Sequence, residues 1–387
     1  MTSRLPAPDA DAQRASDALV SCIRDEIGNA GGWIGFDRFM EMALYTPGLG
    51  YYSGGAHKVG EAGDFVTAPE LGPIFAQTLA GQARQILALS APHLIEVGAG
   101  SGRLAADLLL ELERCGSLPE SYRILELSGE LRGRQRAMLA ELAPHLLPRV
   151  DWLDRLPERF CGLVLANELL DALPVHLARW NGEAIFERGV AWRDGRFAWE
   201  DVPARGRVLE HAQKTAAEYR PPAGYVSEIG LAAGDWTAAW GAILAHGALL
   251  LIDYGFPRHE FYHPRRASGT LMCHYRHRAH GEPFFLPGLQ DITAHVDFTA
   301  IAESGCEAGL ELLGYTTQAA FLLNNGVTGI LARTPYEDAK RYLPQAQAVR
   351  KLVSPAEMGE LFKVMALGKG IAAPLDGFSS GDRSVSL

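Results

Sequence analysis

The feature that most constrains the fold of this chain is a short apolar segment that runs directly into a cluster of glycines. His93–Val97 has the length and composition of a buried strand, and Gly98, Gly100 and Gly102 follow it. A helical pattern then begins at Leu104. Glycine permits sharp backbone turns and leaves no Cβ in the way of a bound molecule. A strand, glycine loop and helix in this order are therefore typical of ligand-binding α/β folds.

Further apolar segments alternate with helical segments after this unit. The pattern predicts strands at Tyr122–Leu127, Arg149–Trp152, Gly162–Ala166 and Gly247–Asp253, and helices at Leu104–Cys115 and Leu131–Leu142. Strands separated by helices predict βαβ units, and continuous apolar strands predict a parallel sheet covered on both faces. The expected fold class is therefore α/β, with a doubly wound, Rossmann-like sheet.

Composition excludes some classes of function and indicates a cellular compartment. The chain has 387 residues and a net charge of -10, which argues against a general nucleic-acid binder with a basic face. None of the five cysteines forms a C-x-x-C pair, so no metal site is expected. No apolar segment reaches the ~18 residues of a membrane span. The scattered cysteines and the lack of a signal-peptide pattern predict a cytoplasmic protein.

The glycine loop favours a ligand that carries positive charge. Dinucleotide enzymes use G-x-G-x-x-G and place a pyrophosphate on the loop. Here the third glycine comes one residue early, and Glu96 lies two residues before Gly98, where its carboxylate would repel a pyrophosphate. S-adenosylmethionine (SAM) has an amino group and a sulfonium centre and no phosphate. We therefore predict SAM as cofactor over a nicotinamide or flavin; a merely structural glycine turn is the alternative.

Other residues at predicted strand ends are candidates for holding SAM. Glu126 lies ~24 residues after Gly102, close to the spacing of the acidic ribose ligand in nucleoside-binding folds. Asp151 and Trp152 follow the third strand and are candidates for the adenine. Asn167 ends the fourth strand, on the side where open sheets bind ligands. An exposed strand-end glutamate and a core tryptophan are the structural alternatives.

Several blocks of the chain resemble the MidA-type (DUF185) SAM-dependent methyltransferases. The blocks are Tyr45–Tyr52, Gly63–Glu70, Glu96–Gly102, Asn167–Pro174, Leu251–Gly255 and Asp291–Phe298. The family includes a mitochondrial complex I assembly factor regarded as a protein arginine methyltransferase. The resemblance implies a class I methyltransferase core with additional segments over the substrate, and a protein substrate that bears an arginine.

An arginine acceptor would need carboxylates, because the guanidinium is delocalised and has a pKa above ~12. Two carboxylates can grip it and localise its lone pair on one nitrogen. Glu168 and Asp171 are three residues apart after the fourth strand, so we predict them as the catalytic clamp. Capping a helix is the alternative role for either residue.

Two other readings of the function stay open. The chain could be a SAM-binding assembly factor with little catalysis, or a methyltransferase for a small-molecule oxygen or nitrogen. His295 could act as a general base or have a structural role. The rings of Tyr45, Tyr51 and Tyr52 could line the active site or only pack against neighbouring side chains. The cluster His274–Arg278 is expected to be a solvated loop.

Composition and spacing suggest three consecutive regions. Residues 1–90 are expected to be a helical and loop segment that covers the active site. Residues 91–318 are expected to form the SAM-binding methyltransferase core, with inserts at 175–225 and 255–300. Residues 319–387 are expected to add helices and a last strand.

Local signals refine these regions. Helical spacing predicts a helix from Asp11 and another at Phe36–Tyr45. Thr67–Glu70 has the threonine and glutamate of a capping box, which predicts a helix that runs to about Leu89.

Turn signals lie in the first insert and a strand signal lies near the C-terminus. Asn181–Gly182 and Asp194–Gly195 predict an antiparallel β-meander over 175–203. Residues 318–355 read as helices, and Leu361–Leu367 reads as a last strand.

Overall fold

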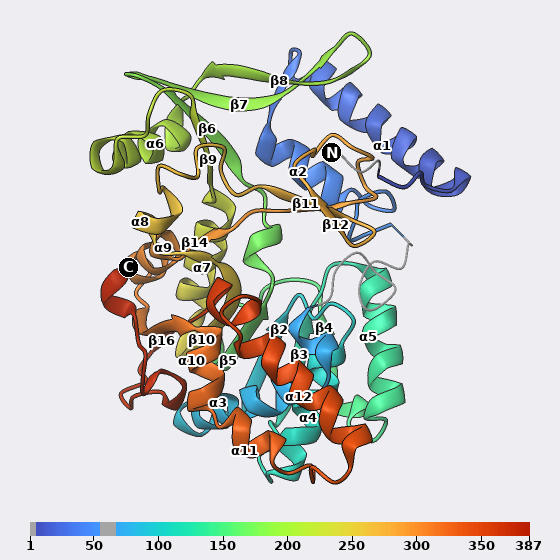
Figure 1. The fold of residues 1–387 in the computed structure, drawn as a ribbon, viewed down its shortest axis with the longest axis vertical. Coiled ribbons are helices and arrows are strands. Elements are labelled where there is room, and N and C mark those ends of the chain that lie inside the picture. Colours follow the sequence, from blue (N-terminus) through green and yellow to red (C-terminus); the bar gives the residue numbers. More distant parts are fainter. Residues whose placement is uncertain (1–4, 55–66) are drawn as a thin grey trace. The chain divides into compact units, whose positions relative to one another are not determined.

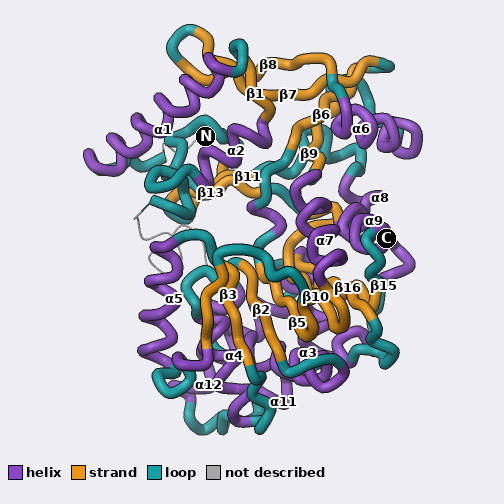
Figure 2. Tube along the Cα trace, turned by 180° about the vertical axis from the view of Figure 1, so that it is seen from behind, coloured by secondary structure: helices purple, strands orange, loops and turns teal. Residues whose placement is uncertain are grey.

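The computed structural model describes residues 5–54 and 67–387, and the chain divides into two compact units (Figures 1 and 2). Unit 1 comprises Met1–Phe65, Leu170–Gly234 and Pro257–Asp297, and unit 2 comprises Val66–Leu169, Asp235–Phe256 and Phe298–Leu387. Unit 2 contains the predicted sheet, and the two predicted inserts contribute to unit 1. Among the described residues, no helix has the length and apolar character needed to cross a bilayer.

In the described part of the chain, seven strands form the main path of the sheet in unit 2. They are β2 (His93–Val97), β3 (Ser121–Leu125), β4 (Val150–Leu153), β5 (Phe160–Asn167), β10 (Leu244–Phe256), β15 (Glu311–Thr317) and β16 (Phe362–Lys369). Their order is β15-β16-β10-β5-β2-β3-β4, and Figure 2 shows β3, β2, β5 and β10 side by side.

Strand direction and order in this sheet confirm the doubly wound fold. Strands β4, β3, β2, β5 and β10 pair in parallel, as predicted, whereas β16 is antiparallel to both β10 and β15. The chain leaves β2 to form β3 on one side and later returns to form β5 on the other. That reversal creates the switch point, outside the carboxyl ends of β2 and β5, at which open sheets bind ligands.

Helices and short 3-10 turns complete unit 2. They are η1 (Ala68–Leu71), α3 (Ile74–Leu89), α4 (Arg103–Arg114), α5 (Gly129–Leu142), η2 (Leu147–Arg149), α9 (Phe298–Glu307), α10 (Gln318–Asn324), α11 (Val327–Leu331), α12 (Ala339–Val353), α13 (Met358–Leu361), η4 (Asp376–Phe378) and η5 (Ser384–Ser386). Buried side chains of α3, α4 and the central strands share one apolar core, which holds the strand ends in place.

The predicted capping box at Thr67 is wrong. Thr67 precedes only the short turn η1, and its side chain makes no capping hydrogen bond. The α-helix begins only at Ile74, seven residues after Thr67, because Gly72 adopts a φ of 125° and Pro73 stands at the helix N-cap. Glu70, the expected capping glutamate, instead accepts a hydrogen bond from the Ser101 hydroxyl at 2.5 Å.

Unit 1 is built on an antiparallel sheet. Its strands are β1 (Trp33–Gly35), β6 (His176–Asn181), β7 (Ala184–Arg193), β8 (Arg196–Pro203) and β9 (Tyr225–Ile229), in the order β1-β7-β6-β9 with β8 on β7. Strands β6 to β8 confirm the predicted meander. Asp194 and Gly195 both have positive φ, at 49° and 78°, as a tight hairpin turn requires.

The remaining elements of unit 1 are a small sheet and several helices. They are β11 (Met272–Tyr275), β12 (Arg278–His280), β13 (Asp291–Thr293), the short strand β14 (Val296–Asp297), α1 (Ala10–Asn29), α2 (Phe36–Tyr45), η3 (Leu170–Ala172), α6 (Gly206–Tyr219) and α8 (Arg258–Phe261). Helix α7 (Leu231–Ile243) begins in unit 1 and ends in unit 2. A second apolar core, drawn from α1, α2 and the strands, holds unit 1 together.

Candidate active site

The glycine loop has the conformation that its sequence predicts. Gly98, Gly100 and Gly102 have φ values of 70°, 52° and 85°, in the region that side chains disfavour. A Cβ on Gly102 would lie 2.8 Å from the Cα of Gln135, and one on Gly98 would lie 2.9 Å from the Leu169 side chain. Among residues 5–54 and 67–387, a Cβ on Gly100 would meet nothing within 4 Å, so this face of the loop offers room for an approaching ligand.

Glu96 is more deeply buried than its position beside the loop suggested. Its side chain is 2% exposed and accepts a hydrogen bond from the Tyr122 hydroxyl of β3 at 2.5 Å. Burial raises the pKa of Glu96 to about 7, although the Tyr122 hydrogen bond acts to lower it. The carboxylate is therefore about half protonated near neutral pH. A cationic group beside it would favour the ionised form.

The carboxylate of Glu126 belongs to a hydrogen-bonded network centred on Gln135. The Gln135 amide donates to Glu126 Oε2 at 3.1 Å and to the Gly100 carbonyl at 3.2 Å. The Trp152 indole donates to Gln135 Oε1 at 2.8 Å. The structure thus brings Glu126, Trp152 and the glycine loop together through Gln135, while their roles in binding SAM stay predictions. Gln135 itself was missed, because a glutamine on a helix has no distinctive sequence signal.

The two residues predicted to bind adenine, Trp152 and Asp151, differ in their surroundings. Trp152 is partly buried, and the guanidinium carbon of Arg136 lies 4.0 Å from its ring centroid. Asp151 is exposed, and none of the interactions of the described residues joins its carboxylate to the Gln135 network. The roles of both residues in binding adenine stay predictions.

The turn after β5 places Asn167 and Glu168 beside the glycine loop. Leu169, the next residue, is the neighbour of Gly98 noted above. Glu168 has a φ of 52°, which is uncommon for a residue with a side chain. Its carboxylate accepts hydrogen bonds from the Asn167 amide at 3.1 Å and from the backbone N–H of Ala68 at 3.3 Å.

The end of β10 holds this turn in place. The backbone N–H of Glu168 donates to the Ile252 carbonyl at 2.8 Å, and that of Leu169 donates to the Asp253 carboxylate at 3.1 Å. Asp253 is 1% exposed and also accepts from the N–H of Tyr254 at 2.9 Å. The sequence placed Asp253 at the end of a predicted apolar strand but gave no signal for its role in holding the turn after β5.

Asp171 lies in unit 1, in the turn η3, and is buried. Its backbone carbonyl accepts from the N–H of Ala294, and the Tyr45 hydroxyl donates to the neighbouring Ala172 carbonyl at 2.8 Å. The Tyr45 and Tyr52 rings stack with their centroids 5.6 Å apart. The Tyr52 hydroxyl donates to Asp291 at 3.0 Å.

Burial and nearby carboxylates dominate the electrostatics of this part of unit 1. Asp171 is 4% exposed and Asp291 is 7% exposed. Burial, followed by the charges of Asp291 and Asp171, raises the pKa of Tyr52 well above its usual value. The tyrosine hydroxyl therefore stays protonated beside two acids.

Unit 1 also contains the other segments singled out in the sequence, His295 and His274–Arg278. The backbone N–H of His295 donates to Thr270 Oγ1 at 3.0 Å, which neither supports nor excludes a general base. The expected solvated loop at His274–Arg278 is wrong for most of the segment, because β11 includes His274 and Tyr275, β12 begins at Arg278, and Tyr275 is buried. The Gly63–Val66 part of one family block lies outside the described residues.

The residues around the glycine loop fit SAM. Gly100 offers an open backbone surface, and Glu126 lies within the Gln135 network beside it. Asn167 supplies a further observation, because its buried Oδ1 atom accepts no hydrogen bond from the described part of the chain. The described residues that would hold SAM are Glu96, Gly98, Gly100, Gly102, Glu126, Trp152 and Asn167.

Comparison with known proteins supports this assignment. The family model for S-adenosyl-L-methionine-dependent methyltransferases matches residues 71–316. A crystal structure of a COG1565 superfamily member from Burkholderia thailandensis, bound to S-adenosyl-homocysteine, is 54% identical. It covers 99% of this chain and 100% of that chain, with a TM-score of 0.96.

Curated relatives are more distant in sequence. The mouse (Mus musculus) mitochondrial protein arginine methyltransferase NDUFAF7 is 29% identical over 370 residues, which cover 85% of this chain and 79% of the mouse protein. Its Drosophila melanogaster homologue is 28% identical over 421 residues, covering 97% of this chain and 91% of the fly protein. The family model, the relative with bound S-adenosyl-homocysteine and the geometry of the glycine loop agree, and this chain belongs to the MidA-type family of SAM-dependent methyltransferases.

Proposed function

We propose that this SAM-dependent methyltransferase acts on an arginine of a protein partner. The observation that carries the proposal is the pair of buried carboxylates, Asp171 and Asp291, beside the stacked rings of Tyr45 and Tyr52 in unit 1. Carboxylates can bind a guanidinium bidentately, and aromatic faces attract its positive charge. The names of the mouse and fly relatives support the same acceptor.

Different residues of the chain would bind the methyl donor, SAM, and the methyl acceptor, the guanidinium. When bound, SAM supplies an electrophilic methyl group on a sulfonium centre. Glu126 would accept hydrogen bonds from the ribose hydroxyls, and the open glycine loop would let the cofactor approach. Asp171 would hold the guanidinium and favour a lone pair on one nitrogen.

Glu168 is the second proposed catalytic carboxylate. The Asn167 amide and the Ala68 N–H hold its Oε1 atom, which fixes the direction of the side chain. A fixed negative charge would stabilise the guanidinium as it gains a methyl group, at no cost of reorganisation during the reaction.

The proposal is tested by incubating the protein with labelled SAM and a cell lysate, followed by mass spectrometry of the labelled products. Glu168→Gln and Asp171→Asn keep the side-chain shape and remove the charge. Each is expected to lower arginine methylation by about 100-fold. Calorimetry of S-adenosyl-homocysteine binding should show an affinity close to that of the unmodified protein.

Each other outcome assigns a different function. Label in small molecules alone would identify a small-molecule methyltransferase. Cofactor binding without any labelled product would favour a SAM-binding assembly factor. Normal turnover of Glu168→Gln would contradict its role in catalysis. The cytoplasmic location inferred from the cysteine pattern stays a prediction.

A further inference from the structure

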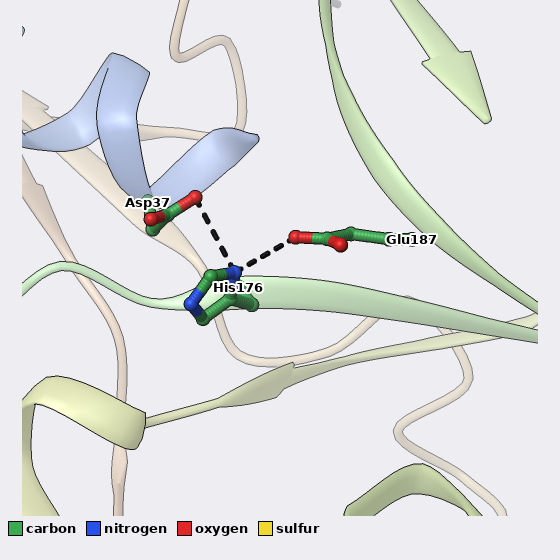
Figure 3. A group of neighbouring side chains, drawn as sticks. All are labelled: Asp37, His176 and Glu187. Carbon is green, nitrogen blue, oxygen red and sulfur yellow. Dashed lines mark hydrogen bonds and ion pairs between the residues drawn. The ribbon is translucent and has the colours of Figure 1, made fainter. Parts of the chain in front are cut away.

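A group of three potential metal ligands lies within unit 1 and includes none of the candidate site residues discussed so far. Figure 3 shows His176 between the carboxylates of Asp37 and Glu187. The Nδ1 atom of His176 is 2.8 Å from Glu187 Oε1 and 3.3 Å from Asp37 Oδ1. The three ligand atoms all lie within 4.8 Å of one another. Carboxylate oxygens of two acids therefore lie close to the same nitrogen atom, Nδ1 of His176.

Three different elements bring these side chains together. His176 is the first residue of β6, Glu187 lies in β7, and Asp37 lies in the first turn of α2. Ala178 pairs with Glu187, and His176 lies two residues before Ala178. His176 and Glu187 therefore face the same side of the sheet as diagonal neighbours.

Gly35 leaves the space that the two carboxylates occupy. It is the last residue of β1, directly before α2, and it pairs with Gly189 of β7. A Cβ at this position would collide with Asp37 Oδ1 and would lie 3.3 Å from Glu187 Oε1. The backbone thus forms a cradle into which both acids project.

The site is partly buried, and the pKa values of Asp37 and His176 are shifted. Side-chain exposure is 33% for Asp37, 21% for His176 and 14% for Glu187. Burial raises the pKa of Asp37. Burial lowers the pKa of His176, as does the charge of Arg207 on α6, but Glu187 and Asp37 outweigh both and keep it raised. A bound cation would have to displace the proton on His176.

We propose that Asp37, His176 and Glu187 bind a divalent first-row transition metal ion of the zinc type. One imidazole nitrogen and two carboxylate oxygens suit such an ion, and the two acids match its charge. Tetrahedral bonds of about 2.0–2.2 Å separate ligand atoms by about 3.3–3.6 Å. The His176–Asp37 distance of 3.3 Å already lies at the edge of this range, and the His176–Glu187 distance of 2.8 Å would have to lengthen by about 0.5 Å. Partial exposure leaves a fourth position for water.

The expected role of the ion is structural. It would tie α2, β6 and β7 of unit 1 together through ligands that are far apart in the sequence. Because the unfolded chain does not hold a preformed site, binding would stabilise the folded state. This role does not depend on which acceptor the methyltransferase uses.

The test is a titration of the full chain, stripped with a chelator, with Zn²⁺, Co²⁺ and Mg²⁺. We expect one equivalent of Zn²⁺ to bind and raise the thermal midpoint, Co²⁺ to give the visible absorption of a low-coordinate site, and Mg²⁺ to do neither. Zinc affinity should fall as the pH is lowered and His176 retains its proton.

Matched variants locate the site. His176→Ala, Glu187→Gln and Asp37→Asn should each weaken zinc binding at least about tenfold and remove the thermal shift. The control is His145→Ala, which removes a histidine paired with one acid, Glu113, at 2.8 Å in unit 2. His145→Ala should bind zinc like the unmodified protein. Equal zinc binding by the three site variants, or no thermal shift in the unmodified protein, would overturn the proposal in favour of a protonated ion-pair triad.

Discussion

At the scale of single residues, Glu168 combines a proposed catalytic side chain with a strained backbone. Its φ of 52° favours glycine. Glu168→Ala removes the carboxylate and keeps the strain, whereas Glu168→Gly removes both. We expect the glycine variant to be more stable than the alanine variant by about 1 kcal/mol and both to be inactive. Urea unfolding measures the difference; a less stable glycine variant would show that the backbone is not strained.

Glu96 should make the stability of the protein depend on pH. Its folded pKa of about 7 lies above the usual value of 4.5. The stability it contributes is therefore present at low pH and is lost as the pH rises through about 7. Relative to the unmodified protein, Glu96→Gln should gain on the order of 3 kcal/mol of unfolding free energy between pH 5 and pH 8.5.

A second variant checks the cause of this pH dependence. Tyr122→Phe removes the hydrogen bond that lowers the pKa of Glu96, so the transition should move to higher pH. Parallel stability profiles for Glu96→Gln and the unmodified protein would refute the assignment.

At the scale of elements, Asp201 ties the strands of the meander together. It accepts hydrogen bonds from Arg179 of β6 at 2.6 Å and from Arg188 of β7 at 2.7 Å. Burial acts to raise the pKa of Asp201, but Arg188 and Arg179 outweigh it and keep the pKa low. The stabilisation is therefore present at neutral pH and is lost as the pH falls through the folded pKa.

Asp201→Asn is expected to lower the free energy of unfolding by about 1 kcal/mol at pH 7, since solvent screens the half-exposed pairs. The difference should shrink in acid. The control is Glu200→Gln, which breaks a more exposed pair with Arg193 and should cost less than about 0.5 kcal/mol. Equal losses in the two variants in urea unfolding would contradict the bridging role of Asp201.

At the scale of the whole molecule, bound cofactor should stabilise the fold through the glycine loop. S-adenosyl-homocysteine at 100 times its Kd is expected to add about 2.7 kcal/mol and raise the thermal midpoint. Gly100→Ala should lose most of this shift, because the new methyl group occupies the open face of the loop.

Gly116→Ala is the matched control for Gly100→Ala. Gly116 has a similar φ of 64° and equally open surroundings, but it follows the opposite end of α4. Both alanine variants should lose about 1 kcal/mol of stability, and only Gly100→Ala should lose the ligand-induced shift. A full shift in Gly100→Ala would place the cofactor elsewhere.

Predictions from the sequence held where a local signal was enough. The strands β2 to β5, the meander and the positive φ of Gly98, Gly100 and Gly102 depend on hydrophobic periodicity and on residue conformation. The capping box failed because Thr67 and Glu70 have the right spacing, while Gly72 and Pro73 delay the helix. Gln135 and Asp253 were missed, because their importance comes from partners that no spacing reveals.

The sequence by itself determined the order of strands and helices and a glycine loop suited to SAM, because these follow from interactions between residues that are near in the chain. Only the tertiary structure decided that Tyr122 faces Glu96 and that Asp37 and Glu187 meet on one nitrogen of His176. Such meetings depend on strand register and on the packing of distant segments, which set both the separation of the charges and their exposure to water.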